Sequence, residues 1–154
     1  MLVRNVARVL TLLACLLPMT AWAGHRATWP TTQCVLAAAH NDRVPALVIL
    51  GVMKVEGGKP GQAVRDSNGS YDMGPMQVNS LWLPKLRGLG IDARKLTDNG
   101  CTNVAVGTAI LALELERAHG NLAKAVGWYH SQTPDLTKHY RDKVRRAITT
   151  FLEH

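Results

Sequence analysis

The stretch Val44–Glu56 reads VPALVILGVMKVE, and it is apolar at nearly every position until it ends in a carboxylate. A helix that is apolar on all sides is buried at the centre of a fold, so this segment predicts the core helix. Pro45 suits the first turn of a helix, and Gly57-Gly58 would end it. The segment therefore places one acid at the end of the most buried element.

Glu56 is the only acid between Val44 and Arg65. Apolar neighbours and the negative end of the helix dipole would both raise the pKa of its carboxyl group. A carboxylic acid that stays protonated near neutral pH can donate a proton to a leaving oxygen. The alternative is an exposed glutamate in the last turn without a catalytic role, and Glu56 taken alone does not decide between the two.

Helices are predicted on both sides of this core. Thr31 or Thr32 can cap a helix that ends near residues 41–42. The polar, Gly-rich segment 57–75, with the turn signal Asn68-Gly69, predicts an irregular loop or a short hairpin. The sequence therefore predicts a mainly α-helical single domain. Further helices are expected at residues 79–86, at 101–118, from Asn121, and from Thr133-Pro134, where Leu136, Tyr140, Val144, Ile148 and Leu152 form one apolar stripe.

The first 23 residues have the order of a secretory signal. Arg4 and Arg8 precede an apolar run at residues 9–17, and the small-x-small ending is completed at Ala23. Residues 24–154 would then form the mature domain, periplasmic or exported. Stable membrane insertion is not expected, because no later stretch approaches about 20 apolar residues. The alternative is a lipoprotein signal with Cys15 as the lipidated residue.

The composition of the mature domain fits export. Without residues 1–23 the chain keeps 16 basic and 11 acidic side chains, a formal net charge of +5. A basic surface suits anionic wall polymers, membrane surfaces and nucleic acid alike, and export argues against nucleic acid as a partner. The two remaining cysteines, Cys34 and Cys101, favour a disulfide in an oxidising compartment, with two buried free thiols as the alternative.

The segment after the core helix carries the most specific pattern. Residues 68–82 read NGSYDMGPMQVNSLW and follow S-x-D-x-G-x-x-Q-x-N-S-x-W, downstream of a single glutamate. With Cys101-Thr102-Asn103 and the later Tyr129-His130-Ser131, this order resembles the specialised lytic transglycosylases of the lysozyme-like superfamily. Those are small periplasmic enzymes associated with secretion systems and pili. The resemblance covers roughly residues 34–140 and implies a lysozyme-like domain.

The resemblance also implies a reaction. Glu56 matches the single acid/base, which would protonate the bond between N-acetylmuramic acid and N-acetylglucosamine in peptidoglycan. It would then deprotonate the muramoyl hydroxyl that attacks its own anomeric carbon, which leaves an anhydromuramoyl end. Tyr129 matches an aromatic residue whose phenol can hydrogen-bond and orient the glutamate. The residues that match the floor of the saccharide groove are Gly74, Met76, Gln77 and Asn79. Alternatively, Met76 fills the core, and Gln77 and Asn79 bond only to the backbone of a short loop.

Three positions depart from the family pattern. Gly57 stands where a serine often follows the glutamate, Pro75 replaces a leucine at the groove wall, and His130 replaces an asparagine after the tyrosine. The contacts of that serine and that asparagine are therefore not carried over to this chain.

Asp72 leaves the class of glycan-cleaving enzyme open. Its position resembles the second carboxylate of the chicken-type lysozymes, which are hydrolases, and a second carboxylate can form or stabilise a glycosyl intermediate. It could face substrate, or it could only organise the Asn68-Gly69 turn. The rivals to a transglycosylase are therefore a hydrolytic muramidase and a non-catalytic glycan-binding component of an assembly machine.

No cofactor or metal is expected. The six histidines, at positions 25, 40, 119, 130, 139 and 154, lack the spacing and cysteine partners of a zinc site. The partners implied are peptidoglycan glycan strands, with components of a secretion system or pilus as further candidates.

Overall fold

The computed structural model describes residues 26–153, so the predicted signal peptide, its cleavage after Ala23, and Cys15 lie outside the described residues. Helices dominate, with one small sheet, which confirms the predicted mainly α fold class. The elements are α1 (Thr32–Asp42), α2 (Ala46–Glu56), β1 (Ala63–Arg65), β2 (Tyr71–Met73), β3 (Val78–Asn79), the 3-10 turn η1 (Ser80–Trp82), α3 (Leu83–Arg87), α4 (Ala93–Asp98), α5 (Gly100–Arg117), α6 (Leu122–His130) and α7 (Pro134–Leu152).

Several helix ends lie where the sequence places them. The Thr31 side chain accepts a hydrogen bond from the backbone N–H of Cys34 and caps α1, and Asn121 caps α6 in the same way. Helix α2 ends at Gly57, whose φ of +65° is the left-handed conformation that glycine adopts without strain. The short helix α4 is absent from the sequence prediction, although Asp92 caps it.

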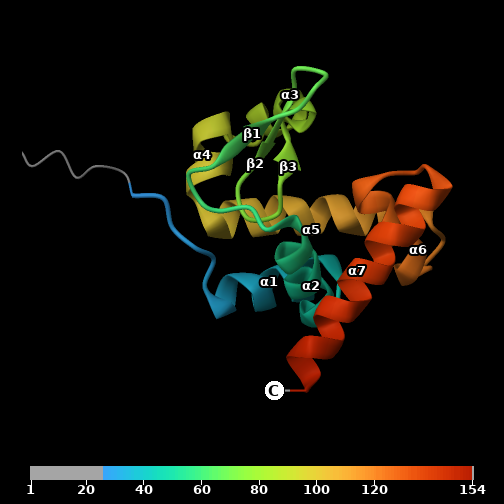
Figure 1. The fold of residues 1–154 in the computed structure, drawn as a ribbon. Helices are drawn as coiled ribbons and strands as arrows, with labels where there is room; N and C mark the ends of the chain where they lie inside the picture. The colour runs from blue at the N-terminus through green and yellow to red at the C-terminus, as the bar shows by residue number, and fades with distance from the viewer. Residues whose placement is uncertain (1–25, 154) are drawn as a thin grey trace, which may run out of the picture.

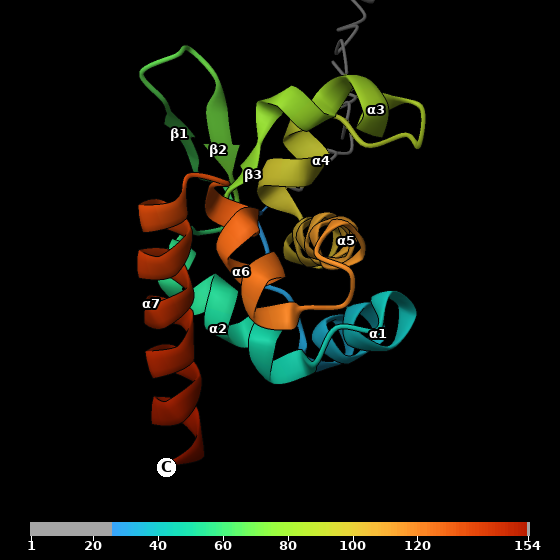
Figure 2. The same cartoon turned by 90° about the vertical axis from the view of Figure 1, so that its right-hand side faces the viewer.

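Helix α5 runs through the middle of the molecule (Figure 1). Seen end-on, it separates the sheet with α3 and α4 from the pair α1 and α2 (Figure 2). Its buried side includes Val104, Ile110 and Leu111, which join the core together with Ile49 and Val52 of α2. Helix α2 packs on α1 and α7 and contributes buried residues to the core, but its Leu47 and Leu50 are 39% and 36% exposed, so the expectation of a helix buried on all sides is wrong for that face.

The sheet is a three-stranded antiparallel meander in the order β1-β2-β3. Val64 pairs with Asp72 across the first ladder, and Asp72 pairs with Asn79 across the second. Gly69, with φ of +87°, lies in the connecting turn. The predicted hairpin at 57–75 is confirmed, while the third strand was not predicted because its two residues give almost no alternation to detect.

A buried side-chain amide ties the sheet to the helices. Asn103 of α5 donates through Nδ2 to the carbonyl oxygens of Met73 (2.8 Å) and Leu96 (3.0 Å). Its Oδ1 accepts from the backbone N–H of Met76 at 2.8 Å. The amide is fully buried, and each of its polar atoms has a partner. It therefore holds three segments against α5: strand β2, helix α4 and the turn between β2 and β3.

The predicted disulfide between Cys34 and Cys101 is confirmed. It joins α1 to the first turn of α5, with a Cα–Cα distance of 5.3 Å. Because the two cysteines are 67 positions apart, the cross-link restricts a long loop of the unfolded chain and contributes about 4 kcal/mol in the chain-entropy treatment.

The apolar stripe of α7 is buried only in its middle. Tyr140 and Val144 are buried and Ile148 packs against the core, whereas Leu136 and Leu152 are 49% and 68% exposed. The spacing alone does not reveal that the apolar side chains near the two ends of this helix stay exposed.

None of the helices within residues 26–153 is both long and apolar enough to cross a membrane by itself. By length and composition, α1 and α2 pass such a test only when taken together, as a pair bent by 118°.

We expect Asn103→Asp to lower the free energy of unfolding by about 3–5 kcal/mol, because a buried carboxylate would face the carbonyl oxygens of Met73 and Leu96. Urea unfolding at pH 7 measures this. The control is Asn99→Asp, an exposed cap of α5 whose acceptor role an aspartate keeps, with an expected change within about 0.5 kcal/mol. Equal losses in the two variants would contradict the role assigned to Asn103.

Candidate active site

Glu56 lies at the boundary between the helices and the sheet. It is the last residue of α2, and the chain then passes directly against the turn at Gly74–Gln77. A Cβ atom at Gly58 would collide with the carbonyl oxygen of Gly74 and the side-chain amide of Gln77. The second glycine after Glu56 is therefore required by close approach, and it brings the carboxyl group next to the predicted groove segment.

The Glu56 carboxyl group is held by a tyrosine of the last helix. The hydroxyl of Tyr140 donates to Glu56 Oε1 at 2.5 Å. The imidazole of His130, at the end of α6, stacks on the Tyr140 ring with a centroid distance of 4.8 Å and an angle of 6°. Two helices that are distant from α2 in sequence thus fix the orientation of one carboxyl group.

The protonation of Glu56 is shifted by its surroundings. Burial raises the pKa of Glu56 from its ordinary 4.5 to about 7. The Tyr140 hydrogen bond opposes this rise, the nearby Asp72 carboxylate adds to it, and Lys143 lowers it slightly. The sequence argument for a raised pKa relied on desolvation and the helix dipole, and desolvation is the dominant cause here.

The expected hydrogen bond from Tyr129 to Glu56 is wrong. The Tyr129 hydroxyl donates to the carbonyl oxygen of Met76 at 2.8 Å, and the bond to Glu56 comes from Tyr140. Burial raises the pKa of Tyr129, and the carboxylates of Glu56 and Asp72 add to this, so the phenol remains a hydrogen-bond donor. Tyr140 had been placed in the apolar stripe of α7, where periodicity alone gives no sign of a polar role.

A pocket of about 360 Å³ opens beside Glu56. Of the residues predicted for the site, Glu56, Asp72, Gln77, Asn79 and Tyr129 all line it. Sequence reasoning did not assign five further lining residues to the site, and these are Asp66, Val78, Trp82, Ile110 and His130. Trp82 lies within the matched segment 68–82, which could have indicated it, whereas Ile110 carries no such signal.

Two predicted groove residues do not reach this pocket. The side chain of Met76 is fully buried and packs on Gly107 of α5, so it serves the core. Gly74 is buried and has φ of +68°, and a Cβ there would collide with the Asn103 amide. Pro75, expected at the groove wall, is also buried. These residues shape the turn beneath the pocket.

A polar network holds the opposite wall of the pocket. Asn79 Nδ2 lies within hydrogen-bond distance of Asp72 Oδ1 (2.9 Å), Asp66 Oδ2 (3.1 Å) and Ser70 Oγ (2.9 Å). Ser70 also donates to Asp66 Oδ2. The hairpin turn is thus held by Asn68, whose Oδ1 accepts from the Ser70 backbone N–H at 2.9 Å, and by Asp66, while Asp72 and Asp66 both have their carboxyl groups at the pocket.

The Asp72 carboxyl group is itself perturbed. Burial raises the pKa of Asp72, the hydrogen bond from Asn79 opposes the rise, and the Asp66 carboxylate reinforces it. His130 lowers the pKa of Asp72 electrostatically. The pocket thus contains, on its helical side, a carboxyl group with a pKa of about 7 and, on its sheet side, a carboxyl group bound by the Asn79 amide, so it offers both donors and acceptors to a polyhydroxylated ligand.

Comparison with protein families identifies this arrangement. Residues 33–151 match the model described as Transglycosylase SLT domain. The chain belongs to this family. At the level of the family, this SLT transglycosylase is a peptidoglycan lytic transglycosylase, which confirms the enzyme class expected from the sequence.

Similar proteins are known from enteric bacteria. "Invasion protein IagB" of Salmonella typhimurium strain LT2 is 30% identical over 130 residues, which cover 81% of this chain and 75% of that protein. "Protein IpgF" of Shigella flexneri is 28% identical over 117 residues, 75% of this chain and 76% of its own. A "Peptidoglycan-binding-like protein" of Escherichia coli O157:H7 is 39% identical over 64 residues, 40% and 38% of the two chains.

We expect Glu56→Gln to stabilise this SLT transglycosylase at neutral and higher pH. Between pH 4.5 and about 7 the folded protein keeps a proton that the unfolded chain releases, so wild-type stability falls as pH rises through this window. The Glu56→Gln variant has no carboxyl group to titrate, so its stability does not fall in this way. Its free energy of unfolding in urea, relative to the wild type, should rise by about 3 kcal/mol from pH 4 to pH 8. An advantage that does not change with pH would contradict the raised pKa.

The two tyrosines should affect Glu56 differently. Tyr140→Phe removes a donor that favours the carboxylate, so the pKa of Glu56 should rise further, while the ring that stacks on His130 remains. Carboxyl carbon NMR of Glu56 across a pH titration measures the change. Tyr129→Phe is the matched control, because its hydroxyl bonds to Met76, and a larger shift in this control would contradict the assignment.

Proposed function

We propose that Glu56 cleaves the bond between N-acetylmuramic acid and N-acetylglucosamine and leaves an anhydromuramoyl end. The observation that carries this proposal is one buried carboxyl group with a pKa of about 7, held by Tyr140 and open to a polar pocket. A group with this pKa is populated in both protonation states near neutral pH, as an acid that must later act as a base requires.

In the first step, the protonated Glu56 carboxyl group transfers its proton to the glycosidic oxygen, and the bond from that oxygen to the muramoyl anomeric carbon breaks. In the second step, the Glu56 carboxylate accepts the proton of the muramoyl primary hydroxyl as its oxygen bonds to that carbon. Glu56 ends in its starting protonation state and no water is consumed. Tyr140 bonds to the carboxyl oxygen and keeps it oriented through both steps.

The polar wall of the pocket supports substrate binding in this proposal. The amide group of Gln77 lies at the pocket, where it can bind sugar hydroxyl and acetamido groups, whereas the N–H groups of Asn79 are committed to the network with Asp66, Ser70 and Asp72. Gln77 Nε2 also donates to Gly74 O at 2.9 Å, so the side chain is held in place before substrate arrives. Tyr129 lines the pocket through its ring, while its hydroxyl is committed to Met76.

Asp72 supports one other candidate reaction. It lines the same pocket as Glu56, and its charge helps to raise the pKa of the Glu56 carboxyl group. A carboxylate in that position could stabilise a positively charged sugar in either reaction, or carry a hydrolysis that leaves reducing ends. The hydrolytic muramidase is therefore the second candidate.

We also propose an exported, periplasmic location and local wall remodelling during the assembly of a secretion system or pilus. The signal-like order of residues 1–23 supports export. The family's action on peptidoglycan supports a location at the wall. The relative named as an invasion protein supports a role in a host-directed machine, whose components would then be partners.

Mass spectrometry of the ends released from peptidoglycan tests the reaction. We expect anhydromuramoyl ends from the mature wild-type protein and a loss of at least about 1,000-fold in Glu56→Gln, which cannot donate a proton. Asp72→Asn serves as the matched carboxylate control and should retain anhydromuramoyl products at a reduced rate. Reducing ends that disappear in Asp72→Asn would establish the hydrolase. Binding without release of ends by the wild type would support a glycan-binding component.

A further inference from the structure

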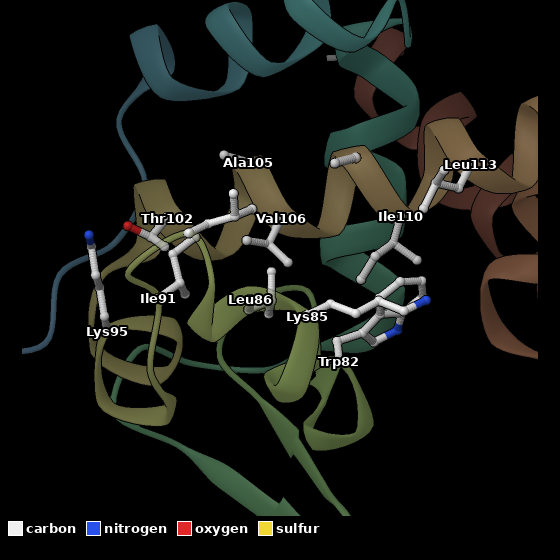
Figure 3. Close-up of a pocket in the computed structure, with 12 residues that line it drawn as sticks. Trp82, Lys85, Leu86, Ile91, Lys95, Thr102, Ala105, Val106, Ile110 and Leu113 are labelled. Atoms are coloured by element: carbon white, nitrogen blue, oxygen red, sulfur yellow. The ribbon is translucent and has the colours of Figure 1, made fainter.

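A second cavity lies next to the catalytic pocket, between α5 and the segment η1–α3–α4 (Figure 3). We call it the α3–α5 groove, and its volume is about 470 Å³. Its surface is mainly apolar and includes Leu86, Ile91, Val106 and Ile110. Trp82 and Ile110 also line the catalytic pocket, so the two cavities adjoin at these residues.

The chemistry of this groove differs from that of the catalytic pocket. The catalytic pocket is lined by carboxyl and amide groups, which bind sugars. The groove offers apolar side chains, the hydroxyl of Thr102 and two lysines. A sugar ring bound there would lose most of its hydrogen bonds to water without replacement, which disfavours a further saccharide.

The two lysines give the groove a positive charge. Lys95 lies at one end and Lys85 lies toward the other, with its Nζ 5.0 Å from the centroid of the Trp82 ring (Figure 3). No acidic residue within 26–153 lines the groove. Asp92 and Asp98 line a neighbouring pocket together with Lys95, where Asp92 caps α4 and Asp98 pairs with Arg94, so these two acids lie outside the groove.

We propose that the α3–α5 groove binds the peptide stem that the lactyl group of muramic acid carries. This inference rests on the proposed peptidoglycan reaction. The stem presents alanine methyl groups and free carboxylates, which match an apolar floor between two lysines. The groove adjoins the pocket at Trp82, so a stem on the strand in the catalytic pocket lies within reach of it. The enzyme therefore selects strands that still carry peptides.

Two forms of one substrate test the proposal: glycan strands with their stems, and the same strands after an amidase has removed the stems. We expect wild-type kcat/KM to be higher on stem-bearing strands. Lys95→Met should lower kcat/KM about threefold on these strands and leave it unchanged on stem-free strands. Lys54→Met, on α2 and outside both cavities, is the matched charge control and should change neither value.

A second variant tests the apolar floor without changing charge. Ala105 is an exposed residue of α5 that lines the groove, so Ala105→Trp should fill it and lower kcat/KM on stem-bearing strands about tenfold. Ala37→Trp, exposed on α1, is its matched control. Equal wild-type rates on both substrates, or equal losses on both in the Lys95 and Ala105 variants, would overturn the proposal.

A binding measurement tests the stem-binding proposal independently of the proposed cleavage reaction. Affinity for the two uncleaved strands is measured in a Glu56→Gln background with and without Lys95→Met. A preference of Glu56→Gln for stem-bearing strands that Lys95→Met reduces would support stem binding, even if the wild type released no ends. No preference would refute stem binding whether or not the wild type cleaves.

Discussion

The side-chain amide of Asn103 joins the sheet side of the site to the central helix α5. It bonds to β2, to the end of α4 and to the turn before β3, from a position on the central helix α5. The turn that it fixes continues into Gln77 and Asn79, which line the catalytic pocket. Because the amide is buried, water cannot replace any bond that it loses, so the sheet side of the pocket depends on this one residue.

The packing around Glu56 gives its carboxyl group an unusual pKa and lowers the stability of the fold at neutral pH. Helix α2 must be apolar to fill the core, and its last residue is therefore desolvated, which raises the pKa of Glu56 to about 7. Tyr140 limits this rise by donating a hydrogen bond to the carboxyl group. The structure thus holds Glu56 near the midpoint of its titration, where a carboxyl group can give and regain a proton.

Local patterns in the sequence predicted the helices other than α4, the caps of α1 and α6, and the hairpin, because a cap or an apolar repeat acts over a few residues. The disulfide was predicted from the even number of cysteines left after export. Local patterns also predicted Glu56, Asp72, Gln77 and Asn79 through the order of residues 68–82. They did not predict that Tyr140 would bond to Glu56, since the two residues are 84 positions apart and meet only through the packing of α7 on α2. Met76 was predicted at the groove but is buried in the core. Its position beside groove residues in the sequence does not reveal that its side chain turns inward.

The structure explains two departures from the family pattern, at Gly57 and at His130. Gly57 ends α2 in a left-handed conformation, and Gly58 lets the chain pass against the turn at Gly74. No side chain after Glu56 is then needed to hold its carboxyl group, because Tyr140 holds it from α7. His130 stacks on the Tyr140 ring and also lines the pocket. Helices α6 and α7 thereby set the orientation of the Glu56 carboxyl group, whereas the sheet sets that of Asp72. The pocket beside Glu56 lies where these two supports meet.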